Sequence, residues 1–137
     1  MQQMISINSS PQDVYKQQSI LTAAPLDVIV MLYDALKKNI VLGKKWIVKK
    51  DAQRAHKHLI KAQEIVTELV NSLDMTYEMS EGLLSLYEYI LRNLEEANLR
   101  KDESSLEPII EIINSLREAW HEISLSNKGN LYLEIES

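Results

Sequence analysis

Cysteine and phenylalanine are both absent from this 137-residue chain, and glycine and proline occur only three times each. Without cysteine the chain has no disulfide framework, no thiolate nucleophile and no cysteine-based metal site. So few glycines and prolines leave few breaks in regular structure, and the abundant Leu, Ile, Glu, Lys and Ala favour long helices. The core must therefore be built from aliphatic residues, tyrosines and two tryptophans.

A basic surface and a long apolar run are missing as well. The formal net charge of −5 argues against a general nucleic-acid binder. The longest unbroken apolar run, residues 28–33, is far too short to span a bilayer. The first twelve residues lack the basic-then-apolar order of a signal peptide. We therefore expect a cytoplasmic protein that neither binds nucleic acid nor inserts into a membrane.

The chain divides into three parts by composition. Residues 1–12 are polar and without periodicity, so we expect a flexible N-terminus. A helical bundle is predicted over residues 13–126, beginning with a short helix over residues 13–21. The end of the chain, residues 127–137, is too short for a fold of its own and is predicted to be a flexible tail.

After Pro25 the sequence is typical of long amphipathic helices joined by short turns. Pro25 suits the first turn of a helix, where its missing N–H costs little, and Asp51 is a good N-cap for the next helix. In that second helix, apolar residues alternate by three and four without a miss: Ala52, Ala55, Leu59, Ala62, Val66, Leu69 and Leu73. Four such helices predict an all-α fold, an antiparallel four-helix bundle.

The first long helix carries more apolar surface than one core face requires. At about 100° per residue, one stripe contains Ile29, Leu32, Leu36, Ile40 and Ile47. A second stripe, roughly a third of a turn away, contains Val28, Met31, Ala35, Leu42 and Trp46. The third long helix repeats the excess with Leu84, Tyr87 and Leu91.

This surplus has several interpretations. Both stripes can bury against neighbouring helices, or the N-terminal segment can cover the second stripe. The second stripe can also form a dimer interface, or a groove for an amphipathic helix of another chain. The pattern alone does not decide which stripe faces outward.

Signals for catalysis are weak. Glu118 and His121 match one unit of a di-iron bundle, but such a site needs two units, so a surface pair is favoured. Residues 58–62 resemble the phosphoacceptor segment of histidine phosphotransfer domains, with His58 as acceptor, although Ala62 stands where those domains have glycine. Phosphate-binding loops and metal-ligand clusters do not occur in the sequence. We expect no enzyme, no cofactor and no metal, and keep phosphotransfer through His58 as the alternative.

Several segments in order resemble the flagellar export chaperone family FliS, from about residue 11 to residue 122. They read "VYKQQSILTAAP", "VMLYDALKKNI", "HLIKAQEIVTELVNSLD", "LLSLYEYILRNLEEANLRKD" and "LREAW". The resemblance implies a four-helix bundle with a short N-terminal helix. It also implies a cytoplasmic, non-enzymatic chaperone that binds the disordered C-terminal region of flagellin. Such a chaperone prevents premature polymerisation and hands flagellin to the flagellar type III export gate.

The resemblance also carries over to particular residues. In such proteins an N-terminal segment covers an apolar pocket until flagellin arrives, and the matching cap residues here are Tyr15, Leu21, Thr22, Ala23 and Pro25. The family's "MLY" and "LY" motifs match Met31, Leu32, Tyr33 and Tyr87. Together with the second stripe they predict a flagellin-binding groove of Val28, Met31, Leu32, Tyr33, Ala35, Leu42, Trp46 and Tyr87. Gln12 departs from the family, where many relatives carry a second tyrosine.

Overall fold

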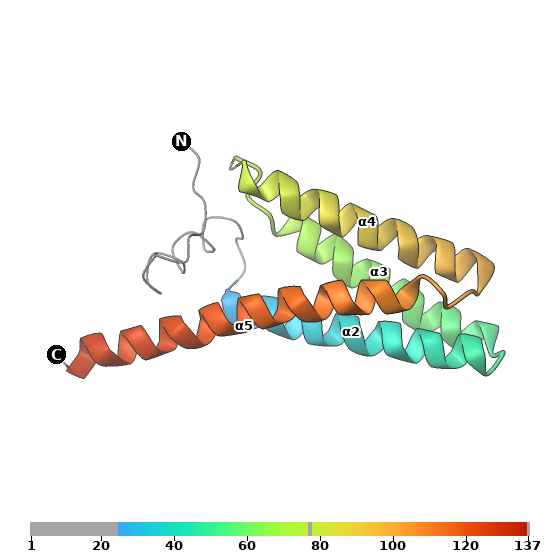
Figure 1. The fold of residues 1–137 in the computed structure, drawn as a ribbon, viewed down its shortest axis with the longest axis horizontal. Helices are drawn as coiled ribbons and strands as arrows, with labels where there is room; N and C mark the ends of the chain where they lie inside the picture. The colour runs from blue at the N-terminus through green and yellow to red at the C-terminus, as the bar shows by residue number, and fades with distance from the viewer. Residues whose placement is uncertain (1–24, 77, 137) are drawn as a thin grey trace.

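The computed structural model describes the backbone of residues 25–76 and 78–136, and the side chains as far as Leu125 except that of Met79. The regular elements in these ranges are four α-helices: α2 (Leu26–Val48), α3 (Ala52–Asn71), α4 (Met79–Arg100) and α5 (Leu106–Glu136). Consecutive helices run in opposite directions and are joined by short turns (Figure 1). The predicted all-α, antiparallel four-helix bundle is confirmed.

The helix starts follow the local sequence. Pro25 directly precedes α2, and its carbonyl oxygen accepts a hydrogen bond of 3.1 Å from the N–H of Ile29. The Asp51 carboxylate accepts one from the N–H of Arg54, also at 3.1 Å, and so caps α3 as predicted.

The predictions for the two ends of the chain have different outcomes. The short helix expected over residues 13–21 lies outside the described residues. The C-terminal tail expected after residue 126 does not begin there, because α5 stays helical to Glu136. Residues 127–136 contain no proline and one glycine, Gly129, so little in the sequence stops the helix.

The core forms where the first stripe of α2 meets α3. Ile29, Leu36 and Ile40 of that stripe are at most 1% exposed. The middle of the α3 seam is buried as predicted, at Ala55, Leu59, Ala62, Val66 and Leu69. Gly43 brings the two helices close together, since a Cβ atom placed there would lie 2.7 Å from Cδ2 of Leu59.

Polar pairs along α2 hold α5 beside it. Lys44 forms an ion pair of 2.8 Å with Glu107, and Arg117 forms one of 2.9 Å with Asp34. Further along, the Ser124 hydroxyl donates a hydrogen bond of 2.6 Å to Asp27. Since the two ion pairs are exposed, they fix the alignment of the helices more than they add stability.

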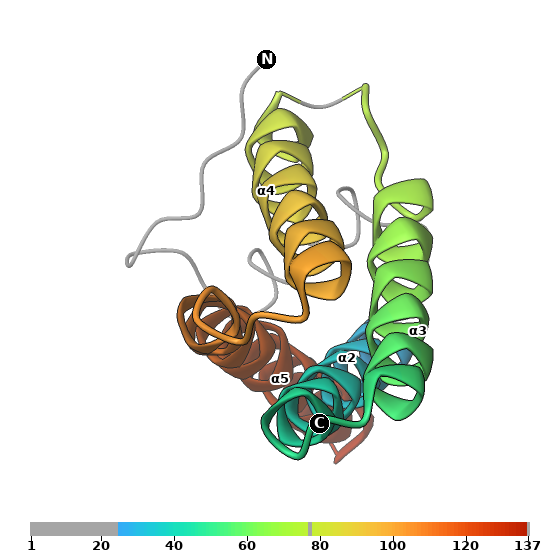
Figure 2. The same ribbon diagram turned by 90° about the vertical axis from the view of Figure 1, so that its right-hand side faces the viewer.

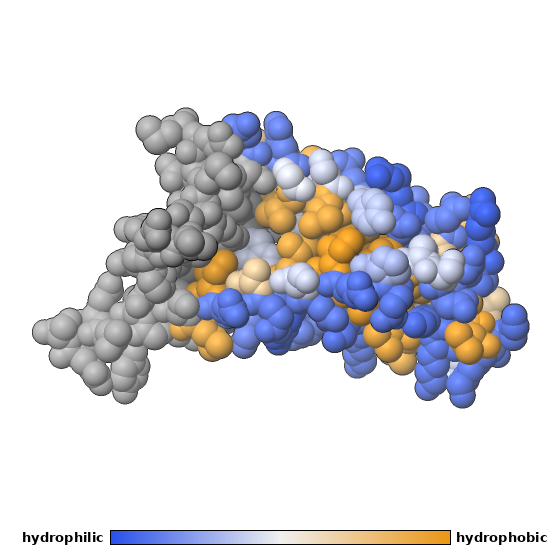
Figure 3. All heavy atoms as spheres, viewed as in Figure 1, coloured by the Kyte–Doolittle hydropathy of each residue, from blue (hydrophilic) through white to orange (hydrophobic). Residues whose placement is uncertain are grey.

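Helix α4 packs mainly on α3 and has few contacts with α5. Viewed along the bundle, α4 stands apart from α5 while α2 and α3 lie together (Figure 2). Apolar side chains reach the surface along the line between α4 and α5 (Figure 3). None of the helices in the described ranges has a stretch long and apolar enough to cross a membrane.

Candidate functional site

The two stripes of α2 face different surroundings. The first stripe enters the core, whereas in the second stripe the side chain of Met31 is 67% exposed and that of Val28 42% exposed. The other members of the second stripe, Ala35, Leu42 and Trp46, are half-buried. The structure therefore decides the orientation that the sequence left open: the second stripe is the outward one.

Three further predicted groove residues lie deeper than the second stripe. Leu32 is half-buried and packs on the core. Tyr33 and Tyr87 are 0% and 2% exposed, and their hydroxyl oxygens are 2.6 Å apart in a hydrogen bond. Because both rings sit inside the bundle, neither lines the open stripe in this conformation. Tyr87 fits the periodicity of a surface stripe as well as that of the core, because tyrosine is amphipathic, whereas Tyr33 was assigned to the groove through the family motif.

Burial changes the acid–base behaviour of this tyrosine pair. Removal from water disfavours the phenolate and raises the pKa of Tyr33 far above its usual value, and the nearby Tyr87 adds to the rise. Burial also raises the pKa of Tyr87, although the hydrogen bond from Tyr33 opposes that rise. Both hydroxyls are therefore neutral at physiological pH and act as a fixed polar link between α2 and α4.

On its α3 side, the second stripe is bordered by a half-buried polar pair. Nδ1 of His58 lies 3.1 Å from Oδ1 of Asn39. Partial burial lowers the pKa of His58, and the charges of Lys57 and Lys38 lower it further, so the ring is neutral at pH 7.

The surroundings of His58 also bear on the phosphotransfer alternative. Ala62, at the position where phosphotransfer domains have glycine, is fully buried in the core. His58 itself lines an open hollow of about 470 Å³, together with Lys57 and Lys61. Space for a phosphoryl group is therefore present beside His58, and phosphotransfer stays the alternative that a His58→Gln variant tests.

At the C-terminal end of the stripe, Trp46 lies between two cations. The guanidinium of Arg54 is 4.6 Å from the centre of the indole, and the ammonium of Lys45 is 4.9 Å from it. Cation–π attraction holds the indole in place. Sequence reasoning found Trp46 but missed the partners, because Arg54 belongs to the next helix.

A second partly open apolar surface lies between α4 and α5 (Figure 3). The half-buried apolar side chains of these helices include Leu83, Leu86, Ile112, Leu116 and Ile123. Four of them, Leu83, Leu86, Leu116 and Ile123, have the three- and four-residue spacing that is typical of an inward helix face. Seam periodicity identifies the inward face but not how closely the neighbouring helix approaches, so this opening was not predicted.

The cap residues are described only in part. Tyr15, Leu21, Thr22 and Ala23 lie outside the described residues. Pro25 is exposed and starts α2. The assignment of a cap thus stays a prediction.

In an all-α bundle, apolar side chains on the outer face of one helix are suited to binding a helix of another chain. Comparison with known proteins is more specific: residues 7–127 match the family model described as Flagellar protein FliS. The chain belongs to the FliS family.

Individual relatives agree with this assignment. The chain is 33% identical over 119 residues to a flagellar secretion chaperone FliS of Bacillus subtilis, covering 87% of this chain and 90% of that protein. It is 30% identical over 111 residues to the protein of the same description from Salmonella typhimurium, covering 79% and 82%. A third, from Campylobacter jejuni, is 27% identical over 118 residues, covering 85% and 92%.

Proposed function

We propose that this protein is an export chaperone whose outward stripe on α2 binds the C-terminal segment of flagellin as an amphipathic helix. The observation that carries the proposal is the orientation of α2 in a member of the FliS family. One apolar face of this helix already completes the core, and the second, with Met31 at its most exposed point, remains outside. An exposed apolar face of this kind is a candidate interaction site.

Binding a disordered client has an entropy cost that the chaperone surface must offset. Fully burying one Met or Val side chain contributes roughly 1.5–3 kcal/mol, so a stripe of several partly exposed apolar residues is a sufficient platform for a helix. A chaperone that binds monomeric flagellin and not the filament lowers filament assembly by mass action. In this proposal the complex forms in the cytoplasm and is delivered to the type III export gate.

The N-terminal cap completes the proposal. Tyr15 and the residues 21–23 are assigned to a segment that covers apolar surface in the free protein and is displaced by the client. The absence of the second family tyrosine, at Gln12, would make such a cap easier to displace here.

The test uses titration calorimetry with monomeric flagellin from the same genome, intact and lacking its C-terminal segment. We expect saturable one-to-one binding to the intact protein and none to the truncated one. Replacing the exposed Met31 by aspartate places a charge on the stripe without disturbing the core. Met31→Asp should weaken binding at least about tenfold, since it removes apolar contact and requires burial of a carboxylate.

Val41→Asp is the matched control. Val41 is 44% exposed on the same helix, about 80° around it from Met31 and about 140° from Val28, on the side from which Asp34 and Lys44 reach α5. We expect Val41→Asp to bind flagellin like the wild type. If Met31→Asp and Val41→Asp bind flagellin with equal affinity, the stripe is not the binding site. If intact flagellin does not bind the wild type, the proposed function itself is refuted.

A further inference from the structure

The outward stripe of α2 runs through a basic part of an acidic chain. Residues 37–61 hold nine of the chain's 15 Lys and Arg residues but only one of its 20 Asp and Glu residues. This range comprises the second half of α2, the following turn and the first half of α3. A concentration of positive charge beside an apolar surface restricts which partners that surface attracts.

Two exposed lysines of α2 follow the edge of the stripe that faces away from α3. Lys38 comes three residues after Ala35, and Lys45 three residues after Leu42, so each lies about 60° around the helix from that stripe member. Since they are seven residues apart, they lie on the same side of α2, two turns from each other. Neither forms an ion pair with the described residues. We call these two lysines the α2 row.

Two cations of α3, which we call the α3 row, follow the opposite edge of the stripe. The guanidinium of Arg54 lies 4.6 Å from the ring centre of Trp46. Lys61 comes seven residues later and lines an open hollow together with Asn39 of α2. Both cations therefore lie on the side of α3 that is turned toward α2.

The two rows face each other across the stripe. One facing pair is defined by distances: the ammonium of Lys45 and the guanidinium of Arg54 lie 4.9 and 4.6 Å from the centre of the Trp46 indole. Because α2 and α3 are antiparallel, seven residues back along α2 and seven residues forward along α3 lead in the same direction (Figure 1). The second facing pair, Lys38 and Lys61, thus follows about 10 Å further along the stripe.

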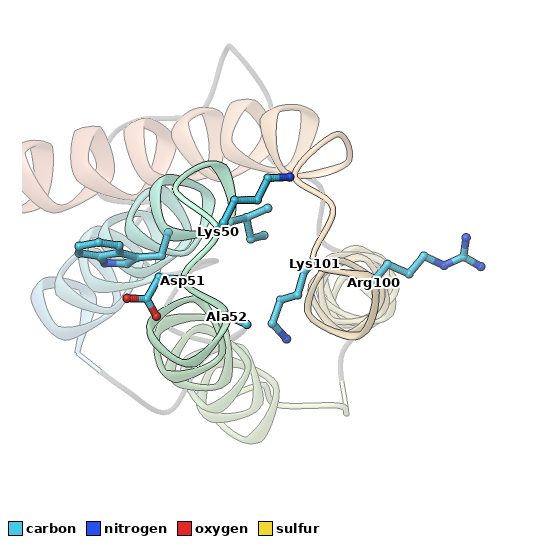
Figure 4. A pocket seen from close by; sticks show the side chains of 7 residues that line it. Lys50, Asp51, Ala52, Arg100 and Lys101 are labelled. Carbon is cyan, nitrogen blue, oxygen red and sulfur yellow. The ribbon is translucent and has the colours of Figure 1, made fainter.

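The cations at the end of the bundle do not join these rows. Figure 4 shows Lys50, Arg100 and Lys101 at the α2–α3 turn and at the end of α4, with side chains that point in different directions. The ammonium of Lys101 is held by two oxygens of Asn98, and Arg100 pairs with Glu96. These groups therefore do not converge on a common ligand.

The rows, in contrast, are accessible to a partner. In the α3 row, Arg54 lies 3.6 Å from Asp51 and Lys61 lies 3.9 Å from Glu64, and all four side chains are at least 36% exposed. Exposed pairs of this kind contribute little to stability. Acidic groups of a bound partner can therefore replace them.

We propose that the two rows select a client helix with acidic residues on both sides of its apolar seam, spaced two turns apart. This inference rests on the proposed function and adds the charge pattern of the client. A helix lying between the rows presents its flanking residues to both, as the e and g positions of a coiled coil do. The apolar stripe supplies the contact area, and the ion pairs supply selectivity and faster association.

An anionic lipid surface is the other occupant that an apolar stripe with flanking lysines would fit. The half-buried Ala35, Leu42 and Trp46 lie between the rows, within reach of a narrow helix but too recessed to enter a bilayer. The repeat of seven residues in both rows also matches two turns of a helix, whereas a fluid lipid surface requires no such spacing. The geometry therefore favours a helix.

The experiment compares two synthetic peptides of the C-terminal segment of flagellin from the same genome. One has the native sequence, and in the other every Asp and Glu is replaced by Asn or Gln. In titration calorimetry at low salt, the wild type should bind the native peptide about tenfold more tightly. The difference should shrink as salt is added, because the ion pairs are exposed to solvent.

Two neighbouring lysines of α2 provide a matched comparison. Lys38→Gln removes a cation of the α2 row, whereas Lys37→Gln removes an exposed lysine about 100° away around the helix. Lys38→Gln should bind the native peptide roughly threefold more weakly, and Lys37→Gln should bind it like the wild type. Lys38→Gln/Lys45→Gln should lose roughly tenfold. None of these variants should change the affinity for the neutralised peptide, since the charge that the lysines pair with is absent from it.

The outcomes separate this inference from the proposed function. Failure of both peptides to bind the wild type would refute the proposed function. Equal binding of the two peptides at low salt would overturn the acidic client alone, and so would equal losses for both peptides in Lys38→Gln/Lys45→Gln. Vesicles containing phosphatidylserine test the lipid surface. If they bind the wild type but not this double variant, while the two peptides bind equally, the rows serve a lipid surface and the proposal is overturned.

Discussion

The buried tyrosine pair allows a quantitative test of what holds α4 in the bundle. Tyr33 and Tyr87 join α2 to α4 through one hydrogen bond of 2.6 Å, with their ring centres 6.5 Å apart. Replacing either residue by phenylalanine keeps the ring but leaves the partner hydroxyl buried without this bond. An unsatisfied buried group costs about 1–3 kcal/mol, so each single variant should lose stability in this range. Tyr33→Phe should lose more than Tyr87→Phe, because the Tyr33 hydroxyl also hydrogen-bonds to Trp120 and keeps that bond when Tyr87 is replaced.

The double variant Tyr33→Phe/Tyr87→Phe should behave differently. Both hydroxyls are gone, so only the buried Trp120 side chain, which also hydrogen-bonds to Tyr33, loses a partner, and the loss should be no larger than that of Tyr33→Phe. The coupling energy of the double-mutant cycle should thus be about 1–2 kcal/mol in favour of the pair. For a chain of this size, each single variant should melt roughly 4–10 °C lower.

Urea unfolding followed by far-ultraviolet circular dichroism measures these free energies. The slope of the free energy against urea should be unchanged, because the surface exposed on unfolding is the same. Additive losses in the double variant would refute the reasoning. They would mean that the two hydroxyls are stabilised independently, by water or other partners, and that the pair does not tie α4 to α2.

Two further predictions concern stability. Gly43→Ala should lower the free energy of unfolding by about 1 kcal/mol, because crowding of the fully buried Leu59 outweighs the better helix propensity of alanine. Gly82→Ala, whose Cβ meets no neighbour, should raise the free energy of unfolding by about 0.5–1 kcal/mol, and urea unfolding of the two variants checks the opposite signs. The free energy of unfolding should also fall as pH rises above about 10. Near that pH the unfolded chain releases its tyrosine protons, whereas in the folded state burial raises the pKa of Tyr33 and Tyr87, so that both keep their protons. Urea unfolding of the wild type and of Tyr33→Phe/Tyr87→Phe should be compared between about pH 8 and pH 11, a range that brackets the pKa of a free tyrosine. The free energy of unfolding should fall less with pH in the variant.

Helix positions and the main core faces could be predicted from the sequence because they depend on periodicity and local caps. The strict seam of α3 left one solution for its inward face, and Pro25 and Asp51 marked helix starts by local chemistry. These features need no knowledge of distant residues.

The remaining features depend on how helices meet. The periodicity of α2 showed two apolar stripes, but only packing decided that Met31 faces out. Tyr87 was interpreted as surface because a tyrosine fits either environment, and its partner is 54 residues away in the sequence. The left-handed backbone conformation of Lys50 and Lys101, with φ of 63° and 52°, was not predictable, because the usual signal for that conformation is glycine or asparagine.

The loose edge between α4 and α5 has a consequence for the motions of the molecule. Helix α2 is joined to α3 by a close approach at Gly43 and to α5 by polar pairs, whereas α4 is joined to α5 by few contacts. The easiest excursion of the native state is therefore a swing of α4 away from α5 about its packing on α3. Such partial openings require less free energy than global unfolding and recur within microseconds to seconds. Each opening briefly exposes aliphatic side chains that the closed bundle buries. The apolar area that becomes accessible over time is therefore larger than the area exposed in the closed structure.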